Sequence, residues 1–308
     1  MKVISLFSGA GGLDLGFEKA GHKIVFANDI FTDAVKTYEK NFKFKPDPRN
    51  ISRIKTKEIP SGAILIAGFP CQGFSIANRG RFLNDPRNKL YKYILRIAKA
   101  KKVKVMVLEN VKGLLNFCNG KYFEKIKKDI EKLDYRVIDQ VLNAADYGVP
   151  QMRQRLILLC VHRSFKKKIS FPPQKTHCDP KVAYKLNLQP WRTIGDALKH
   201  FPDPKKFNKI PNHQASKYKL RFNGHLGHRY IKPSHPAPTI TARGDERGGV
   251  VVIHHPSNKR RITAREAAAI QSFPDSFIFL GSKTSAYRQI ANSVPPLLGY
   301  ALGKCIPK

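Results

Sequence analysis

The sequence predicts an α/β fold in which a Rossmann-like mixed sheet is joined to a smaller, loop-rich domain. Short apolar runs alternate with amphipathic helical patterns up to about residue 160, the order of elements found in a wound sheet. From 163 to about 261 the chain becomes rich in Pro, His and Lys and loses helical periodicity, which then returns. We therefore expect one domain from residues 1–162 plus 264–308 and a second from 163–263.

The strands are expected where apolar residues run without interruption, because strands buried on both faces of a sheet have no polar alternation. These runs cover residues 3–7, 23–27, 63–67, 103–108, 136–143 and 156–161. Helices are expected where apolar residues recur with a helical period. Those patterns cover residues 13–20, 32–41, 89–101, 122–133, 263–271 and 296–304.

The charge of the chain indicates its partner. Lys and Arg number 57 against 22 Asp and Glu, which leaves a net charge of +35. Such a field attracts a polyanion through counterion release, and nucleic acid is the first candidate. The excess is densest over residues 161–263, with 22 basic and 5 acidic side chains, so we expect the smaller domain to contact the polyanion. A hydrophobic content of 42% over 308 residues excludes a disordered basic tail.

The spacing of the cysteines and the length of the apolar segments indicate the cellular compartment in which the protein works. The five cysteines are odd in number, widely spaced and free of any CxxC pair, which argues against a disulfide framework and against a zinc site. The histidines offer no convincing ligand set either, so no metal is expected. No stretch of ~20 apolar residues is present and the first residues do not form a signal peptide. A cytoplasmic protein without membrane association is expected.

Cys71 has the most informative context of the five cysteines. It follows the predicted strand 63–67 across Gly68, Phe69 and Pro70. In open α/β sheets, active-site loops leave the carboxyl ends of the strands, which is where a nucleophile belongs. A lone free cysteine is more often a small buried hydrophobic residue, so the neighbouring motifs must decide.

A glycine-rich loop follows the first predicted strand and contains Gly9, Gly11 and Gly12. Glycines let the backbone turn sharply and approach a ligand at a helix N-terminus. Asp14 stands where a dinucleotide-binding motif would have its third glycine, so that class of ligand is disfavoured. Asp29 follows the second strand, where an acidic residue can hold ribose hydroxyls. Together these features favour an adenosine-type ligand without phosphates, although a glycine loop alone is equally well a structural turn.

Two further clusters lie next to predicted strands. Glu109 follows strand 103–108, on the same edge of the sheet as Cys71, where a carboxyl group can share or donate a proton. Arg153 and Arg155 alternate just before strand 156–161, which points both guanidinium groups the same way. Taken singly, a surface acid and a solvated strand end explain these residues as well as a catalytic site does.

In this order along the chain, six segments resemble motifs of the DNA (cytosine-5)-methyltransferase family, of the restriction–modification type. They cover residues 7–17, 70–72, 109–111, 151–155, 261–275 and 286–295, and the likeness extends over nearly the whole chain. Any one motif could arise by chance, but six in the family's order are hard to explain otherwise.

The resemblance implies transfer of a methyl group from S-adenosyl-L-methionine to C5 of a flipped-out cytosine in a specific double-stranded DNA sequence. S-adenosyl-L-homocysteine would be the second product. Cys71 would add to C6 of the base, Glu109 would act at N3 and Arg155 at O2. Arg153 would anchor this site or a phosphate.

The resemblance also implies which residues bind the cofactor and the DNA. Asn50 departs from the family, which usually has Asp there, but its carbonyl oxygen can accept the bond from the adenine amino group. The residues implied at the cofactor are Phe7, Gly9, Gly11, Gly12, Leu13, Asp29, Asn50, Ile51, Pro70, Leu90, Asn292 and Ser293. Those implied at the DNA are Ser75, Thr239, Arg243 and Arg247.

Two alternatives stay open beside a DNA methyltransferase. An RNA methyltransferase of the same superfamily would share the catalytic loop, but such relatives resemble this chain less over 163–261. A catalytically inactive DNA-binding relative would have little reason to keep Cys71, Glu109 and Arg155 together. We expect a monomer that associates with the nucleoid through DNA, and a cognate restriction endonuclease could act on the same site.

Overall fold

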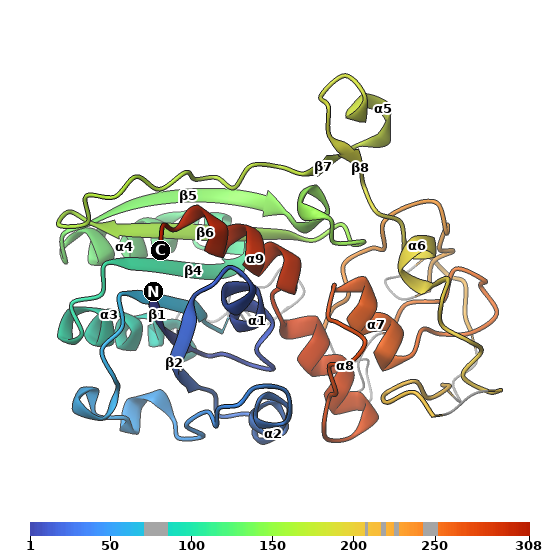
Figure 1. Ribbon diagram of the computed structural model, residues 1–308, viewed down its shortest axis with the longest axis horizontal. Helices are drawn as coiled ribbons and strands as arrows, with labels where there is room; N and C mark the ends of the chain where they lie inside the picture. Colours follow the sequence, from blue (N-terminus) through green and yellow to red (C-terminus); the bar gives the residue numbers. More distant parts are fainter. Residues whose placement is uncertain (71–85, 207–208, 217–219, 225–227, 243–251) are drawn as a thin grey trace.

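The computed structural model describes residues 1–308 except 71–85, 207–208, 217–219, 225–227 and 243–251. Its centre is a six-stranded sheet in the order β2-β1-β3-β4-β6-β5 (Figure 1). The strands are β1 (Lys2–Leu6), β2 (Lys23–Asn28), β3 (Ile64–Gly68), β4 (Val105–Val111), β5 (Tyr135–Asn143) and β6 (Gln154–His162).

The sheet is mixed, as predicted. Neighbouring strands from β2 to β4 pair in parallel, whereas β6 runs antiparallel to both β4 and β5. The carboxyl ends of β1, β3 and β4 therefore lie at the same edge as the start of β6, where Val111 pairs with Arg155. This edge is where an open α/β sheet binds its ligands.

Helices cover both faces of the sheet and make three layers (Figure 1). One face packs on α1 (Gly12–Lys19), α2 (Thr32–Asn41) and α9 (Pro296–Cys305). The other packs on α3 (Tyr91–Ala100) and α4 (Lys121–Glu131). Alternate residues of β4 serve the two layers, since Val105 and Val107 join the first while Met106 and Leu108 join the second.

The rest of the described chain forms the right-hand part of Figure 1 and a short projection above it. Its elements are β7 (His177–Cys178), α5 (Pro180–Ala183), β8 (Gln189–Pro190), α6 (Ile194–Leu198), α7 (Ala264–Ile270) and α8 (Lys283–Asn292). Ile194, Ile231 and Ile262 belong to the same apolar cluster as α1 and α9. The two parts of the molecule thus share one continuous core.

The segment after β6 returns along the outer edge of β5 before it reaches β7 (Figure 1). The Arg163 amide donates to the Asp134 carbonyl, and the Tyr147 hydroxyl donates to the Pro173 carbonyl. The first residues of the predicted second domain therefore pack on the sheet. The division into 1–162 plus 264–308 and 163–263 stays a prediction.

The predicted fold class is confirmed, and each predicted strand and helix is present, with ends that match or differ by up to three residues. Helix α8 was not predicted. Its buried face includes Ser285 and Gln289, and these polar positions interrupt the apolar pattern that marks a helix in sequence. Among the described residues, no helix has the length and apolar character that crossing a bilayer requires.

Candidate active site

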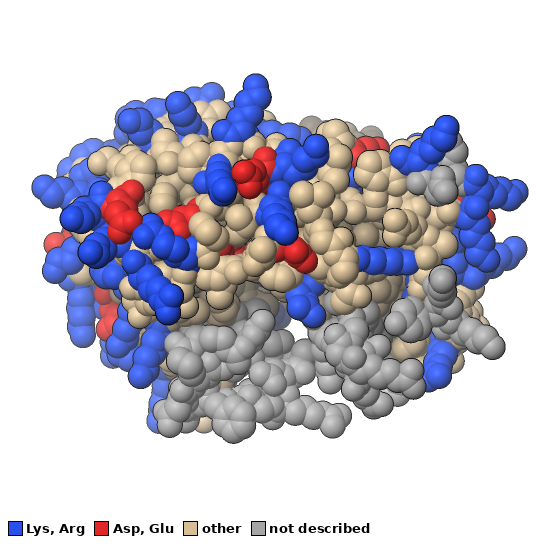
Figure 2. All heavy atoms as spheres, turned by 90° about the horizontal axis from the view of Figure 1, so that it is seen from below, with Lys and Arg blue, Asp and Glu red and all other residues tan. Residues whose placement is uncertain are grey.

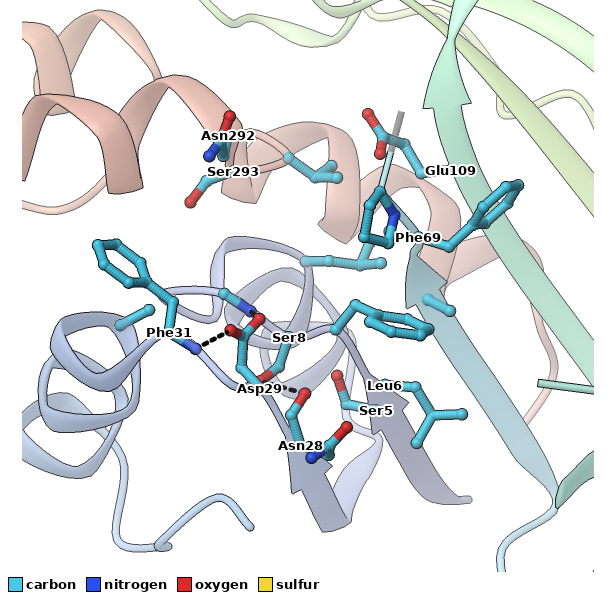
Figure 3. A pocket seen from close by; sticks show the side chains of 18 of the residues that line it. Ser5, Leu6, Ser8, Asn28, Asp29, Phe31, Phe69, Glu109, Asn292 and Ser293 are labelled. Carbon is cyan, nitrogen blue, oxygen red and sulfur yellow. Dashed lines mark hydrogen bonds between the residues drawn. The ribbon is translucent and has the colours of Figure 1, made fainter. Parts of the chain in front are cut away.

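A cavity of about 810 Å³ opens at the carboxyl edge of the sheet. Figure 3 shows Asp29, Glu109, Asn292 and Ser293 around it. Its size is that of a small-molecule cofactor site. The predicted cofactor residues that line it are Phe7, Gly9, Leu13, Asp29, Asn50, Ile51, Pro70, Leu90, Asn292 and Ser293.

The glycine loop shapes the cavity in two ways. Gly9 has a φ of 55°, and a Cβ added there would meet no atom within 4 Å, so a ligand can approach the backbone closely. Gly11 and Gly12 do not line the cavity. Gly11, at a φ of 88°, lies against the Tyr38 and Phe42 rings, and a Cβ on Gly12 would collide with the Val294 carbonyl oxygen. These two glycines instead allow the close packing that holds the loop in place.

Asp29 is fixed by the backbone on both of its oxygens. Gly9 N donates to Oδ2 and Phe31 N donates to Oδ1, each at 2.8 Å (Figure 3). Burial raises the pKa of the Asp29 carboxyl, and these hydrogen bonds oppose that effect. Ile30 follows it, lines the cavity and is 64% exposed. The sequence analysis missed Ile30, although an apolar residue directly after the predicted ribose-binding acid could have indicated it.

Asn50 is held by its own turn. Its Oδ1 accepts a hydrogen bond from Ser52 N at 3.0 Å and caps the 3₁₀ turn Ile51–Arg53. An Asx cap of this kind fixes the direction of the side chain. Asn50 and Ile51 both line the cavity, so the position where Asn replaces the family's usual Asp is part of the pocket wall.

Glu109 and Arg155 form an ion pair in the wall of the cavity, at the carboxyl edge of the sheet. Arg155 Nε lies 2.9 Å from Glu109 Oε1, and both side chains are nearly buried. The two residues come from adjacent antiparallel strands, β4 and β6, whose register brings them together. A charge-assisted hydrogen bond of this geometry holds both groups in one orientation. The structure thus joins two of the predicted catalytic side chains in a single unit.

The residues that lead to Cys71 lie directly beside this ion pair. Gly68 pairs with Glu109 across β3 and β4, and a Cβ on Gly68 would sit 3.3 Å from Glu109 Oε2. The side-chain amide of Asn110 donates to the Phe69 carbonyl at 3.2 Å. The segment 68–70 is therefore anchored to β4 next to the carboxyl group. The predicted residues Cys71, Ser75, Arg243 and Arg247 lie outside the described residues.

Arg153 has a different set of partners from Arg155. It is 1% exposed, and its guanidinium donates to the backbone carbonyls of Ala291, Ser293 and Ile240 at 2.8, 2.9 and 3.3 Å. Both arginines line the cavity. Through these hydrogen bonds Arg153 links the backbone at Ile240 to the backbone from Ala291 to Ser293, and Ser293 forms part of the cavity wall.

Thr239 lies at the junction of the two parts of the molecule. Its hydroxyl donates to the Met152 carbonyl at 2.6 Å, and the Met152 amide donates to the Ala237 carbonyl at 2.8 Å. These bonds hold the segment from Ala237 to Thr239 against the predicted arginine motif. Thr239 itself is not part of the cavity wall.

The described surface carries the excess of positive charge seen in the composition. Figure 2 shows Lys and Arg spread over one face, with few Asp and Glu among them. Within the residues that the structure describes, no group of three or more His, Cys, Asp or Glu side chains could hold a metal ion.

Comparisons with known proteins define the class to which this fold and site belong. The family model for C-5 cytosine-specific DNA methylases matches residues 1–308. The Type II methyltransferase M1.HphI of Haemophilus parahaemolyticus is 35% identical, over 100% of this chain and 87% of its own length. M.MthTI of Methanothermobacter thermautotrophicus is 33% identical, over 100% of this chain and 97% of its own length.

Solved structures agree. A crystal structure of an E. coli protein described as a DNA modification methyltransferase encoded within a prophage superposes with a TM-score of 0.78 at 26% identity, covering 99% of this chain and 97% of that one. The chain belongs to the C-5 cytosine-specific DNA methylase family. It is a DNA methyltransferase of the restriction–modification type, and the resemblance inferred from its motifs is confirmed.

Proposed function

We propose that the protein methylates C5 of a flipped-out cytosine in a specific double-stranded DNA sequence, through a covalent bond between Cys71 and C6. The observation that carries this proposal is the Glu109–Arg155 ion pair beside segment 68–70, in the same cavity as Asp29. This arrangement supports a base and a nucleoside cofactor meeting at one edge of the sheet. A monomer that works on host DNA beside a cognate endonuclease belongs to the same proposal.

The cavity suits S-adenosylmethionine, the donor used throughout this family. Asp29 is positioned to accept hydrogen bonds from ribose hydroxyls, and Ile30 and Ile51 offer apolar surface to a base. Gly9 leaves room for close approach to the backbone, while Asn292 and Ser293 supply polar groups at another wall. When bound, the cofactor supplies an electrophilic methyl group on a sulfonium sulfur.

The chain's own groups would perform the rest of the chemistry. The Cys71 thiolate attacks C6 of cytosine, and the electrons of the C5–C6 double bond become available at C5 to take the methyl group. A proton held at N3 by Glu109 and a hydrogen bond from Arg155 to O2 would stabilise the charge that develops on the ring. Loss of the C5 proton to a base then expels the Cys71 sulfur and restores the aromatic ring.

Base flipping is part of this proposal, and the position of these groups supports it. C6 of a cytosine cannot be reached while the base is stacked in a duplex. Glu109 and Arg155 are almost buried at the sheet edge, which supports a base that has left the helix as the group they contact. Binding energy from phosphate contacts with the basic surface would offset the cost of unstacking.

The decisive test is to methylate a plasmid with the purified protein and map 5-methylcytosine by bisulfite sequencing. Methylation of one cytosine within one recurring sequence is expected. Matched incubations with RNA serve as the control for the RNA-modifying alternative. Transfer to RNA but not to DNA, or no transfer to either in the presence of S-adenosylmethionine, would overturn the proposal.

Arg153→Lys is expected to weaken S-adenosylmethionine binding by roughly tenfold, because one ammonium group cannot replace the fork that ties Ala291 and Ser293 to the cavity wall. Calorimetry measures the dissociation constant. Arg155→Lys is the matched control, and it should lower turnover while the cofactor affinity stays near that of the wild type. Unchanged cofactor affinity in Arg153→Lys would contradict the anchoring role.

Sequence recognition is assigned to residues 163–263, and Arg243 and Arg247 are expected to contribute base contacts. Replacing either with Ala should change which sequences are methylated, because base-edge hydrogen bonds carry specificity whereas phosphate contacts carry affinity. Methylation profiling of random DNA measures the preference. The control is a variant in which Ala replaces Lys166, Lys167 and Lys168. These lysines follow the end of β6 that lies opposite the cavity edge. A shifted preference in the triple Lys→Ala variant, but not in the Arg variants, would refute this assignment.

A further inference from the structure

Asp14 is a buried carboxyl group that the proposed chemistry does not use. It lies in the first turn of α1, is 0% exposed and contributes to the cavity wall. The Tyr38 hydroxyl donates to its Oδ1 at 2.9 Å. The Ser5 hydroxyl also hydrogen-bonds the carboxyl, and Oδ2 is buried with no further partner within the described part of the chain. A carboxyl group buried at a cavity wall acts on a ligand through its charge rather than through direct contact.

The groups around Asp14 do not neutralise it. Ser5 from β1 and Tyr38 from α2 are uncharged donors, and Glu18, one turn along α1, carries the same sign of charge. Helix α9 approaches α1 through Gly299, which lies against Leu13 and brings no charged side chain to this contact. No ion pair of Asp14 is present among the described residues.

Each of the other charged groups described in the cavity has partners of its own or is open to solvent. Arg155 pairs with Glu109, Arg153 holds three backbone carbonyls, and both oxygens of Asp29 accept backbone hydrogen bonds. Arg288 and Lys89 also line the cavity, and both side chains are exposed to solvent, which screens their charge. Within the part of the chain that the structure describes, Asp14 is thus a buried acid of this cavity that no cation contacts, since the buried Arg153 donates to backbone carbonyls instead.

This burial decides the charge of Asp14 near neutral pH. Desolvation raises the pKa of the carboxyl to about 7, although hydrogen bonds from Ser5 and Tyr38 act in the opposite direction. The group is thus neutral in mild acid and becomes an anion at the base of the cavity as the pH rises above 7. A low-dielectric surrounding makes that charge act strongly on any charge that a ligand brings.

We propose that Asp14 sets the preference of the cavity for the positively charged methyl donor over its uncharged-sulfur product. The inference rests on the proposed function, in which S-adenosylmethionine occupies the cavity. The sulfonium of the donor carries one positive charge that the thioether of S-adenosylhomocysteine lacks, so an ionised Asp14 favours the donor alone. A protonated Asp14 favours neither. By linkage, donor binding must also promote release of the Asp14 proton.

Calorimetry on the full-length protein tests this without any measurement of activity. The donor and the product are titrated from pH 5.5 to 8.5 in buffers of low and high ionisation enthalpy. The ratio of the product's dissociation constant to the donor's is expected to rise by about tenfold across this range, the scale of a single charge–charge interaction in a medium of intermediate dielectric constant. Near pH 7, donor binding should release more protons than product binding.

Variants separate Asp14 from the other titrating groups. Asp14→Asn should make the ratio independent of pH and remove the difference in proton release, while Asp29 titrates as before. Glu18→Gln, on the same helix but exposed, is the matched control and should keep both effects. Tyr38→Phe removes a hydrogen bond that lowers the pKa of Asp14, so the midpoint of the pH dependence should move upward.

The outcomes distinguish this inference from the function on which it rests. A wild-type protein that binds both ligands with a ratio independent of pH would refute the role of Asp14 and leave the methyltransferase proposal standing. A protein that binds neither ligand would instead refute the cofactor assignment. If Asp14→Asn does not fold, Tyr38→Phe decides, and an unchanged midpoint in that variant would overturn the inference.

Discussion

Cys71→Ala is expected to abolish methyl transfer, by roughly 10⁴-fold or more, while DNA binding stays close to that of the wild type. The substitution deletes the proposed nucleophile and changes none of the basic side chains that contact phosphates. The cavity walls up to Pro70 are anchored to β4 by Asn110 and do not depend on the thiol. Radiolabelled methyl transfer and a filter-binding assay measure the two quantities.

Covalent trapping of the enzyme on DNA tests whether the attacking atom is the sulfur of Cys71. In DNA that carries 5-fluorocytosine, methylated C5 has no proton to lose, so the bond between the enzyme and C6 should persist. Cys305→Ala is the matched control, because burial raises the pKa of the Cys305 thiol to about 11 and disfavours its thiolate. An adduct that forms in Cys71→Ala, or that disappears in Cys305→Ala, would show that another thiol attacks the base.

The sheet and its reactive edge were predictable from the sequence because both depend on local patterns. Strands such as β4 begin with an uninterrupted apolar run, here residues 105–108, which is what burial between two helical layers demands. Once the strands are placed, their carboxyl ends place Glu109 and segment 68–70 at one edge. The position of Arg155 at the start of β6 then brings it opposite the end of β4.

What the sequence did not reveal depends on contacts between distant segments. The carbonyl groups that accept hydrogen bonds from Arg153 belong to residues 87 to 140 positions away, so the sequence around Arg153 could not indicate these partners. Gly11 and Gly12 pack against the Tyr38 and Phe42 rings and the Val294 carbonyl, contacts that the local sequence did not indicate, while their place at the ligand stays a prediction. The environment of Asp14 likewise requires Tyr38 from another helix. Local sequence identified these positions, and only the packing gave each its role.

Glu109→Gln should lower turnover by ~10²-fold or more, because the amide keeps the shape of the side chain but cannot hold a proton for N3 of the base. Affinity for S-adenosylmethionine should change little, since Asp29, Asn50 and Ile51 lie at other walls of the cavity. Single-turnover methylation and calorimetry measure the two effects. Glu124→Gln, an exposed acid on α4, is the control for a general loss of charge. Turnover equal to that of the wild type would mean that Glu109 is only a structural acid.

The ion pair allows a second and stricter test of the role of Glu109. Because Arg155 Nε contacts Glu109 Oε1 at 2.9 Å, each side chain orients the other, and the two should act on the base as one unit. The double variant Glu109→Gln with Arg155→Gln should therefore lose little more turnover than the more damaging single variant, as groups that work together do. Losses that multiply in the double variant would mean that the two side chains stabilise the ring independently. In that case the contact between them would be a consequence of packing rather than part of catalysis.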